Sequence, residues 1–435
     1  MTTDRTGSRL DPWADTYATR TYGMSASAIR ALFAVASRPE VVSLAGGMPN
    51  LSALPMDAVS EVMSQLVTDT GPTALQYGSG QGDPVLRELI TEVMALEGIR
   101  ASAEDVVVTT GSQQALDLVT RIFVDPGDVV VAEAPSYVGA LGVFRAYQAD
   151  VVHVPMDAAG LQPDLLEETL RALAAAGRRV KLLYTVPNHH NPGGVTLSAE
   201  RRPAVLEVAR RHGVLVLEDN PYGLLGFSGD PLPALRSADA DGVVYLGSFS
   251  KTFAPGLRVG WALAPPAVRD KLVLASEASI LCPSAFAQSA VAGYLQRCDW
   301  RGQVKVYREQ YRERRDALLA ALEDMLPQAS WTVPDGGFYV WLGLPHGLDA
   351  AAMLPRAVTE RVAYVPGTAF FADGQGGSHL RLSYCYPTPE RIREGVRRLA
   401  TVVRAEAELL ETFGPGDGAE HRARRAVDAP GPDVG

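Results

Sequence analysis

Lysine is scarce in this sequence of 435 residues. Of its 40 basic residues only four are lysine, namely Lys181, Lys251, Lys271 and Lys305, and the others are arginine. A reaction that needs an amine nucleophile therefore has few side chains to choose from. The 50 acidic residues give the chain a net charge of −10. This acidic balance argues against a general nucleic-acid binder and against a protein that binds anionic membranes.

Cysteine and long apolar runs are also in short supply. Cys282, Cys298 and Cys385 are too few and too scattered for a disulfide framework, so we expect a reduced, cytoplasmic setting. No apolar stretch reaches the roughly 18 residues that span a bilayer. The polar N-terminus, which includes Asp4 and Asp11, does not resemble a secretory signal. The sequence therefore predicts a soluble protein, with 47% hydrophobic residues to build its core.

Short β-branched runs alternate with longer helical patterns from about Asp105 onward. Buried apolar strands separated by helices predict an α/β fold, in which helices sandwich a mostly parallel sheet. Val259–Ala264 is a further candidate strand. The expected strands are Val106–Thr110, Val129–Ala132, Val151–Val154, Lys181–Val186, Val214–Glu218 and Val243–Gly247, and the expected helices include Gln113–Val124, Asp164–Ala176 and Ala199–His212.

The pattern divides the chain into four parts. Residues 1–40 are expected to form an arm with a short helix at Ser25–Ser37, which packs with the small domain and the substrate site. Residues 41–300 form the large domain, and residues 301–412 form a smaller α+β domain with strands at Gly336–Leu344 and Leu380–Tyr384. Residues 413–435 are rich in Gly, Pro, Asp and Arg and are expected to be disordered.

Small and polar residues follow four of the predicted strands. One such cluster is typical of an ordinary turn, but ligands bind at the carboxyl ends of parallel strands, so four clusters on one rim predict a site. The clusters are Gly111-Ser112-Gln113, Pro187 to Pro192, Glu218-Asp219 before Pro221-Tyr222, and Gly247 to Thr252.

One side of this rim has the residues of a phosphate site. Ser112 and Gln113 open a helix, and free backbone N–H groups at a helix N-terminus suit a phosphate. An ordinary serine cap explains Ser112 equally well when that segment is taken alone. Ser248, Ser250 and Arg258 could add phosphate contacts, since a guanidinium forms charge-assisted hydrogen bonds to such oxygens.

The other side of the rim has a reactive amine and an acid. Lys251 lies on a turn flanked by apolar residues, where desolvation would lower its pKa and favour the neutral amine. Asp219 ends the apolar run VLVLED, and a carboxylate there is costly without a partner. A pyridinium nitrogen would be such a partner, although Asp219 could also cap the following turn.

Taken together, these segments resemble the class I/II aminotransferases of pyridoxal-phosphate fold type I, and most of all the branch that holds 2-aminoadipate, kynurenine and aromatic aminotransferases. The resemblance runs from about Ser25 to Leu410. It implies an aspartate-aminotransferase-like fold with a seven-stranded type of sheet, and pyridoxal 5'-phosphate as cofactor. The matching segments are SLAGGMPN, QYGSGQGDPVLRELI, TTGSQQALDL, EAPSYVGAL, NHHNPGG, LEDNPY, GSFSKTFAPGLRVGW, GGFYVW and HLRLSY.

The resemblance also implies roles for the residues around the cofactor. Lys251 would form the internal aldimine and later move the proton between Cα and the cofactor. Asp219 would pair with the pyridine N–H and keep the ring an electron sink. Tyr222 and Asn191 would hydrogen-bond the ring oxygen, and Tyr137 would stack on the ring. The implied phosphate ligands are Ser112, Gln113, Ser248, Ser250 and Arg258, together with Tyr77 of the neighbouring subunit, which implies a homodimer with shared active sites.

Substrate binding is implied for a second group of residues. Arg381 would bind the α-carboxylate with help from Asn191, and Gly46 and Gly47 would let the backbone approach the substrate. Arg30 resembles a residue that pairs with a distal carboxylate in 2-aminoadipate enzymes, though an arginine that only covers its helix fits as well. The apolar residues around it, which equally suit an aromatic or branched substrate, are Tyr22, Phe33, Leu44, Met48 and Leu51.

We therefore expect ping-pong transamination between an L-amino acid (2-aminoadipate, aromatic or branched-chain) and a 2-oxo acid such as 2-oxoglutarate. Elimination, decarboxylation or oxidation at Cα by the same fold stays an alternative. So does an aminotransferase-like transcription regulator, although only about 40 residues precede Ser43, too few for its DNA-binding module.

Two features depart from the family pattern, and a third motif resembles that of a different family. Gly193 stands where many relatives carry Thr or Ser. The pair His189-His190 is unusual in its loop, but adjacent histidines rarely bind one ion and no third ligand is evident, so no metal is expected. Gly78-Ser79-Gly80-Gln81-Gly82 resembles a dinucleotide loop, yet its third glycine comes one position early and no strand precedes it.

Substitution of Arg30 tests its proposed part in specificity. We expect Arg30→Ala to raise KM for dicarboxylic amino acids far more than KM for leucine or phenylalanine, because only the former have a distal charge to pair. Steady-state kinetics with the three substrates measure the difference. An equal change for all three would remove Arg30 from substrate selection.

Overall fold

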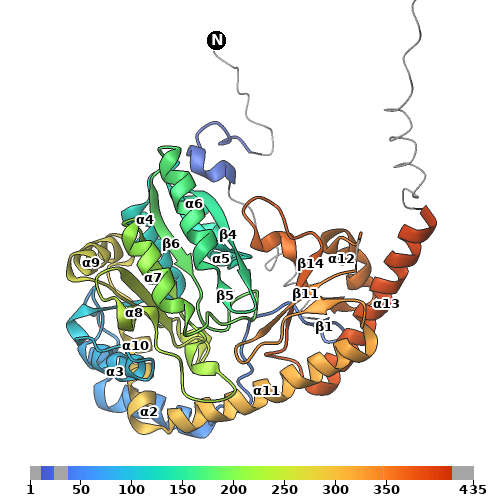
Figure 1. Ribbon diagram of the computed structural model, residues 1–435. Helices are drawn as coiled ribbons and strands as arrows, with labels where there is room; N and C mark the ends of the chain where they lie inside the picture. The colour runs from blue at the N-terminus through green and yellow to red at the C-terminus, as the bar shows by residue number, and fades with distance from the viewer. Residues whose placement is uncertain (1–10, 24–37, 346, 414–435) are drawn as a thin grey trace, which may run out of the picture.

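The computed structural model describes residues 11–23, 38–345 and 347–413. Arg30, the helix expected at Ser25–Ser37 and the tail after Phe413 lie outside these residues. The described chain begins with a turn and the short helix η1 (Thr19–Gly23) and then builds two main sheets, one in each half of the molecule (Figure 1).

An eight-stranded sheet forms the centre of the larger half, in the order β2-β9-β8-β7-β6-β3-β4-β5. Each strand expected between residues 106 and 264 is present. The sheet is parallel from β8 to β4, but β9 runs antiparallel to both neighbours because the chain turns back after β8 without a crossover helix. The strands are β2 (Val106–Thr109), β3 (Val129–Ala134), β4 (Asp150–Asp157), the antiparallel extension β5 (Gly160–Leu161), β6 (Val180–Thr185), β7 (Leu215–Asp219), β8 (Val243–Ser248) and β9 (Gly260–Leu263).

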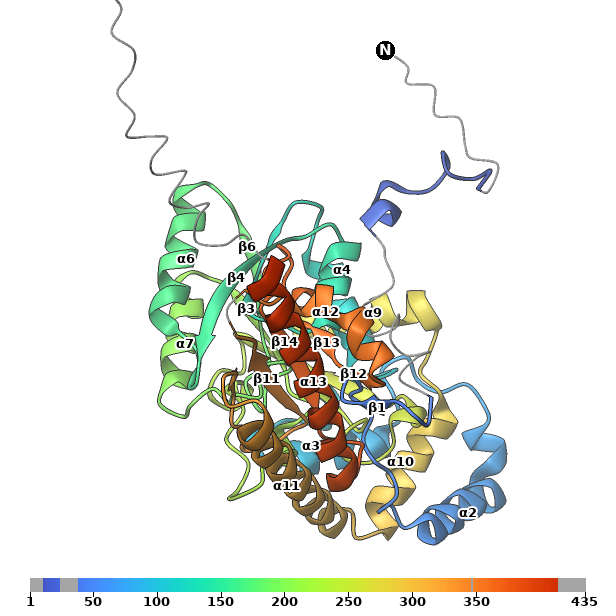
Figure 2. The same ribbon diagram turned by 90° about the vertical axis from the view of Figure 1, so that its right-hand side faces the viewer.

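Both faces of this sheet are buried under helices. Val130 and Ala132 of β3 pack into one apolar cluster and Val129 and Val131 into another, since neighbours along a strand point to opposite faces. Figure 2 shows α6 and α7 on one side of the sheet and α4 on the other. The helices are α2 (Met56–Ala74), α3 (Pro84–Ala95), α4 (Ser112–Phe123), α5 (Val138–Ala146), α6 (Pro163–Ala175), α7 (Arg201–Arg211), α8 (Leu235–Ala238), α9 (Pro266–Ile280) and α10 (Ala285–Arg297).

The second sheet has the order β10-β11-β14-β13 and is antiparallel throughout. A separate parallel pair joins β1 (Val42–Ser43) to β12 (Val362–Ala363), which ties the start of the chain to this half. None of the helices in the described ranges is long and apolar enough to cross a bilayer. This half also contains β10 (Ser330–Trp331), β11 (Tyr339–Gly343), β13 (Val365–Pro366), β14 (His379–Ser383), the short helix η5 (Gly367–Phe370), and helices α11 (Trp300–Met325), α12 (Ala350–Thr359) and α13 (Pro389–Phe413). The domain boundaries stay a prediction.

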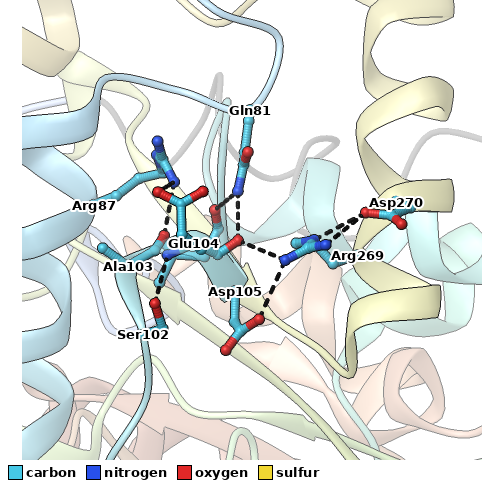
Figure 3. A network of polar contacts seen from close by, with 9 residues as sticks. Gln81, Arg87, Ser102, Ala103, Glu104, Asp105, Arg269 and Asp270 are labelled. Atoms are coloured by element: carbon cyan, nitrogen blue, oxygen red, sulfur yellow. Dashed lines mark hydrogen bonds and ion pairs between the residues drawn. The ribbon is translucent and has the colours of Figure 1, made fainter.

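The glycine-rich segment Gly78–Gly82 lies along the outer edge of β2. The Gln81 carbonyl accepts the Val108 N–H at 2.9 Å. The Gln81 side chain donates to the carbonyls of Glu104 and Val106 at 2.7 and 3.0 Å (Figure 3). Further hydrogen bonds to the same turn, η2 (Ala103–Asp105), come from Arg87 and Arg269. These glycines therefore let the chain cover a sheet edge.

The close approach at Gly82 gives a test of this packing. Gly82 has φ +108°, and an added Cβ would lie 2.5 Å from the Val108 Cβ, so we expect Gly82→Ala to lower the free energy of unfolding by about 2–4 kcal/mol. Gly127→Ala is the matched control, because its φ is +88° and no atom lies within 4 Å of the new Cβ. It should lose only about 1 kcal/mol, from backbone strain. Equal losses in urea unfolding would refute the role of the Val108 contact.

Candidate active site

A cavity of about 350 Å³ lies where the carboxyl ends of β6, β7 and β8 face the second sheet. Most of the residues that the sequence singles out border this one space, although they come from segments far apart in the chain. The lining residues are Gly47, Ser112, Gln113, Tyr137, Val186, Asn191, Asp219, Pro221, Tyr222, Ser248, Ser250, Lys251, Pro255, Arg258, Tyr339 and Arg381.

One end of the cavity is built to hold an anion. α4 begins after Gly111, which has no side chain to cap the helix, so its first N–H groups are open to a ligand. The Arg258 guanidinium lies beside them, and a Cβ on Gly111 would come within 2.5 Å of it. Arg258 also donates to Ser250 Oγ at 3.4 Å. A helix N-terminus, two serines and a guanidinium together suit a phosphate group.

Lys251 supplies the amine at the centre of the cavity. Its Nζ donates to the Gly47 carbonyl at 2.9 Å. Desolvation by the surrounding protein, with repulsion from Arg381 and Arg258, lowers the Lys251 pKa to about 8. A sizeable fraction of this amine is therefore neutral near pH 8 and able to act as a nucleophile. The other lysines are exposed, as Lys271 and Lys305 are, or paired, as Lys181 is with Asp128 at 3.0 Å.

Asp219 is a buried acid with an oxygen to spare. Its Oδ2 accepts a hydrogen bond from Tyr184 Oη at 2.8 Å, while Oδ1 is buried without a hydrogen-bond partner among the described residues. Burial raises the Asp219 pKa to about 6. An unsatisfied carboxylate oxygen of this kind calls for an N–H donor, and a protonated pyridine nitrogen fits that need. Tyr184 was not expected from the sequence, where it reads as a core aromatic residue of β6.

Arg381 is fully buried and has no carboxylate partner among the described residues. It donates to Asn191 Oδ1 at 2.8 Å and to the Ala45 carbonyl at 2.6 Å, and both acceptors are neutral. Its guanidinium carbon lies 4.2 Å from the ring centre of Tyr339 and 5.1 Å from that of Phe370. A buried cation held only by neutral groups is set to receive an anion from a ligand.

Three tyrosines form the aromatic part of the wall. Tyr137 Oη donates to Gln113 Oε1 at 3.3 Å, and desolvation raises the Tyr137 pKa to about 12. Tyr222 Oη lies 3.5 Å from Tyr339 Oη, and burial raises the Tyr222 pKa well above its ordinary value. All three phenols are therefore protonated at neutral pH. The sequence analysis missed Tyr339, whose only signal is its place in the aromatic run of β11.

Two of the predicted site residues that the structure describes, Gly46 and Tyr77, do not line the cavity. Gly46 lies next to it, and its carbonyl is 3.9 Å from the Cys385 sulfur. Tyr77 is 77% exposed and lies away from this chain's own cavity, so its expected contact depends on a second subunit. Arg30 is outside the described residues.

The paired histidines hold a loop in shape. His190 Nδ1 accepts the Gly193 N–H at 3.1 Å, and its Nε2 lies 3.2 Å from Glu133 Oε2. His189 points elsewhere, with its Nδ1 3.0 Å from Asp335 Oδ1. Within the described ranges, no cluster of three or more His, Cys, Asp or Glu residues could bind a metal ion. Both histidines thus fix the segment that carries Asn191.

A desolvated lysine, an acid with a free oxygen and an anion-binding helix end define the class of pyridoxal-phosphate enzymes. The family model for aminotransferase class I and II matches residues 39–399. The chain belongs to this family, and it is a pyridoxal-phosphate-dependent aminotransferase.

Individual relatives agree with this assignment. Aromatic-amino-acid aminotransferase 1 of Thermococcus litoralis is 41% identical over 90% of this chain and 94% of its own. The 2-aminoadipate transaminase of Thermus thermophilus is 38% identical over 92% of this chain and 99% of its own. The crystal structure of Pyrococcus horikoshii kynurenine aminotransferase has a TM-score of 0.87 and 37% identity over 92% of this chain and 99% of its own.

The buried charge of Asp219 gives a prediction for the cofactor-free protein. The raised Asp219 pKa means that ionisation costs stability, and this cost appears above the unfolded pKa of about 4 and is complete above about pH 6. Asp219→Asn should therefore raise the free energy of unfolding at pH 8 by about 1–3 kcal/mol. The gain should shrink as the pH falls from 6 to 4.

Glu218→Gln is the control for this experiment. Burial also raises the Glu218 pKa to about 6, but both of its oxygens accept backbone N–H groups, from Leu235 and Arg236. A glutamine amide loses one of these acceptors, so no stabilisation is expected. Urea unfolding of the two variants between pH 4 and 8 measures the effect. If Asp219→Asn lowered the free energy of unfolding at pH 8, the buried charge of Asp219 would not be the main source of destabilisation at this position.

Proposed function

We propose that this aminotransferase moves the amino group of an L-amino acid to a 2-oxo acid such as 2-oxoglutarate by ping-pong chemistry. The observation that carries the proposal is that the amine of Lys251, the free oxygen of Asp219 and the unpaired cation of Arg381 share one cavity. These groups match the three needs of the reaction, which are a base, an electron-withdrawing cofactor and a hold on the substrate carboxylate.

The residues have distinct tasks in this proposal. Pyridoxal phosphate supplies an electron sink for the substrate Cα when it is bound. Asp219 keeps the pyridine nitrogen protonated, with Tyr184 holding the acid in place. The Lys251 amine takes and returns the proton at Cα, for which a pKa of about 8 is suitable. Asn191 and Tyr222 would hydrogen-bond the ring oxygen. Ser112, Gln113, Ser248, Ser250 and Arg258 would hold the phosphate, and Tyr137 would stack on the ring.

The substrate half of the cavity supports amino acids with aromatic, branched or 2-aminoadipate side chains. Arg381 fixes the α-carboxylate, and the walls near it, from Tyr339, Tyr137 and Val186, carry no charge. Gly47 has no room for a side chain, because a Cβ there would collide with the Tyr339 hydroxyl. We also propose that Arg30 pairs with the distal carboxylate of a substrate such as 2-aminoadipate. The relatives named above act on aromatic amino acids and 2-aminoadipate, which agrees with this substrate range.

The proposal includes a homodimer in the cytoplasm. Large apolar side chains gather on the surface of α2 and of the segment that follows it, including Met56, Val67, Leu75 and Tyr77. Such a patch is typical of a protein interface, and it would bring Tyr77 to the partner's phosphate site. The three free cysteines agree with a reducing compartment.

Chemical trapping and a half-reaction test the proposal together. Borohydride reduction of the holoprotein should fix the cofactor on Lys251 alone, as peptide mapping would reveal. A panel of amino acids should convert the holoprotein to its pyridoxamine form, seen as loss of the visible absorption band, while Lys251→Ala should not convert. A label on another lysine would refute the cofactor assignment. Release of ammonia, CO2 or peroxide in place of conversion would favour another Cα reaction.

A further inference from the structure

Tyr339 of β11 touches the substrate side and the cofactor side of the cavity at once. Its ring centre lies 4.2 Å from the guanidinium carbon of Arg381, and its hydroxyl lies 3.5 Å from that of Tyr222. The same hydroxyl lies so close to Gly47 that a Cβ on this residue would collide with it. Tyr339 is only 2% exposed, so these contacts are made away from bulk water.

The ring of Tyr339 restrains the guanidinium of Arg381. The two hydrogen bonds of Arg381 use Nη1 and Nη2, and its Nε has no hydrogen-bond partner within the described ranges. Polar contacts alone therefore leave one edge of the guanidinium free. A cation over an aromatic face is attracted to it, more strongly when both are desolvated. Tyr339 and Phe370, whose ring centres lie 4.2 and 5.1 Å from the guanidinium carbon, both restrain the group.

The hydroxyl of Tyr339 acts on Tyr222. Burial raises the pKa of both phenols, so each keeps its proton, and Tyr222 Oη donates its proton to Tyr339 Oη. A phenol has a single proton, so donation to one acceptor competes with donation to another. Tyr339 thus competes with the cofactor ring oxygen for the proton of Tyr222 and tempers that contact.

We propose that Tyr339 is a positioning residue that orients Arg381 through its ring and Tyr222 through its hydroxyl, and so couples carboxylate binding to the electronic state of the cofactor. The proposal rests on the functions proposed above for Arg381 and Tyr222. It assigns separate tasks to two parts of one side chain, and two substitutions separate them.

Tyr339→Phe removes the hydroxyl and keeps the ring. The visible absorbance of the holoprotein should then titrate with a midpoint at least about 0.3 pH unit lower, because Tyr222 can donate to the ring oxygen alone, which disfavours the protonated lysine–cofactor linkage. The dissociation constant of 3-phenylpropionate, a carboxylate without an amino group, should change less than about twofold in calorimetry. The other titratable groups facing Tyr222, Tyr339 or Lys251 stay the same in this variant, namely Asp219, Tyr137, Arg258, Arg381 and Cys385.

Tyr339→Leu removes the ring as well. It should weaken 3-phenylpropionate binding about tenfold and shift the midpoint too, since both contacts are lost. Tyr364→Phe is the matched control, because Tyr364 is another buried tyrosine whose hydroxyl bonds only the Ala350 carbonyl. It should leave both readouts unchanged. Thermal unfolding of the cofactor-free variants identifies any loss of folding, and the phenylalanine variant alone still tests the hydroxyl.

The results separate this inference from the proposed function. An unshifted midpoint in Tyr339→Phe would refute the role of the hydroxyl, and unchanged binding in a folded Tyr339→Leu would refute the role of the ring. A wild-type protein without a lysine-bound chromophore would instead contradict the function on which the inference rests.

Discussion

The site depends on the removal of water from three ionisable side chains that form no salt bridge with any described residue. Burial raises the Asp219 pKa and lowers the Lys251 pKa, and it leaves Arg381 with neutral hydrogen-bond acceptors only. In water these groups would be solvated and unremarkable, but in the cavity each one is stabilised by a ligand of complementary charge. The packing of the large fold around the cavity offsets the free-energy cost of burying these groups. The cofactor and the substrate would supply the opposite charges and hydrogen-bonding groups that these side chains need.

The topology of the large sheet explains how the cofactor side is assembled. The parallel strands β6 and β7 end at one rim and deliver Asn191 and Asp219 there. β8 ends at the same rim, and the chain turns back into antiparallel β9, which leaves Lys251 and Arg258 on the connection between these two strands. β9 passes so close to the start of α4 that Gly260 has no room for a Cβ beside Ser112. The backbone therefore holds the Lys251 amine at a fixed distance from the anion-binding N-terminus of α4.

The sequence predicted the elements of the large sheet and most of the cavity, and its failures have physical causes. Asp219 and Lys251 could be recognised because a charged residue at or just after the end of an apolar strand has a high desolvation free energy unless a ligand or another group pairs with it. Tyr184 and Tyr339 could not, because an aromatic residue in a strand reads as core, and only the three-dimensional contacts reveal their polar partners. The two-residue pairing of β1 with β12 has no periodicity to detect. Tyr77 acts, as proposed, across a boundary that a single chain does not contain.

The pairing of β1 with β12 also separates the substrate-binding residues of the cavity from the cofactor-binding residues. Leu44 donates to the Ala363 carbonyl and accepts the Ser383 N–H at 2.7 Å, so the chain leading to Gly47 is fastened to the same sheet that carries Tyr339 and Arg381. Gly47, Tyr339 and Arg381 therefore belong to one connected unit, the substrate frame. The rim of the large sheet forms the cofactor frame, and the hydrogen bonds Arg381–Asn191 and Lys251–Gly47 join the two frames. Mutations in the substrate frame can accumulate and alter the preferred substrate while the cofactor frame retains its chemistry. Such modularity makes new specificities accessible to evolution at little risk to catalysis.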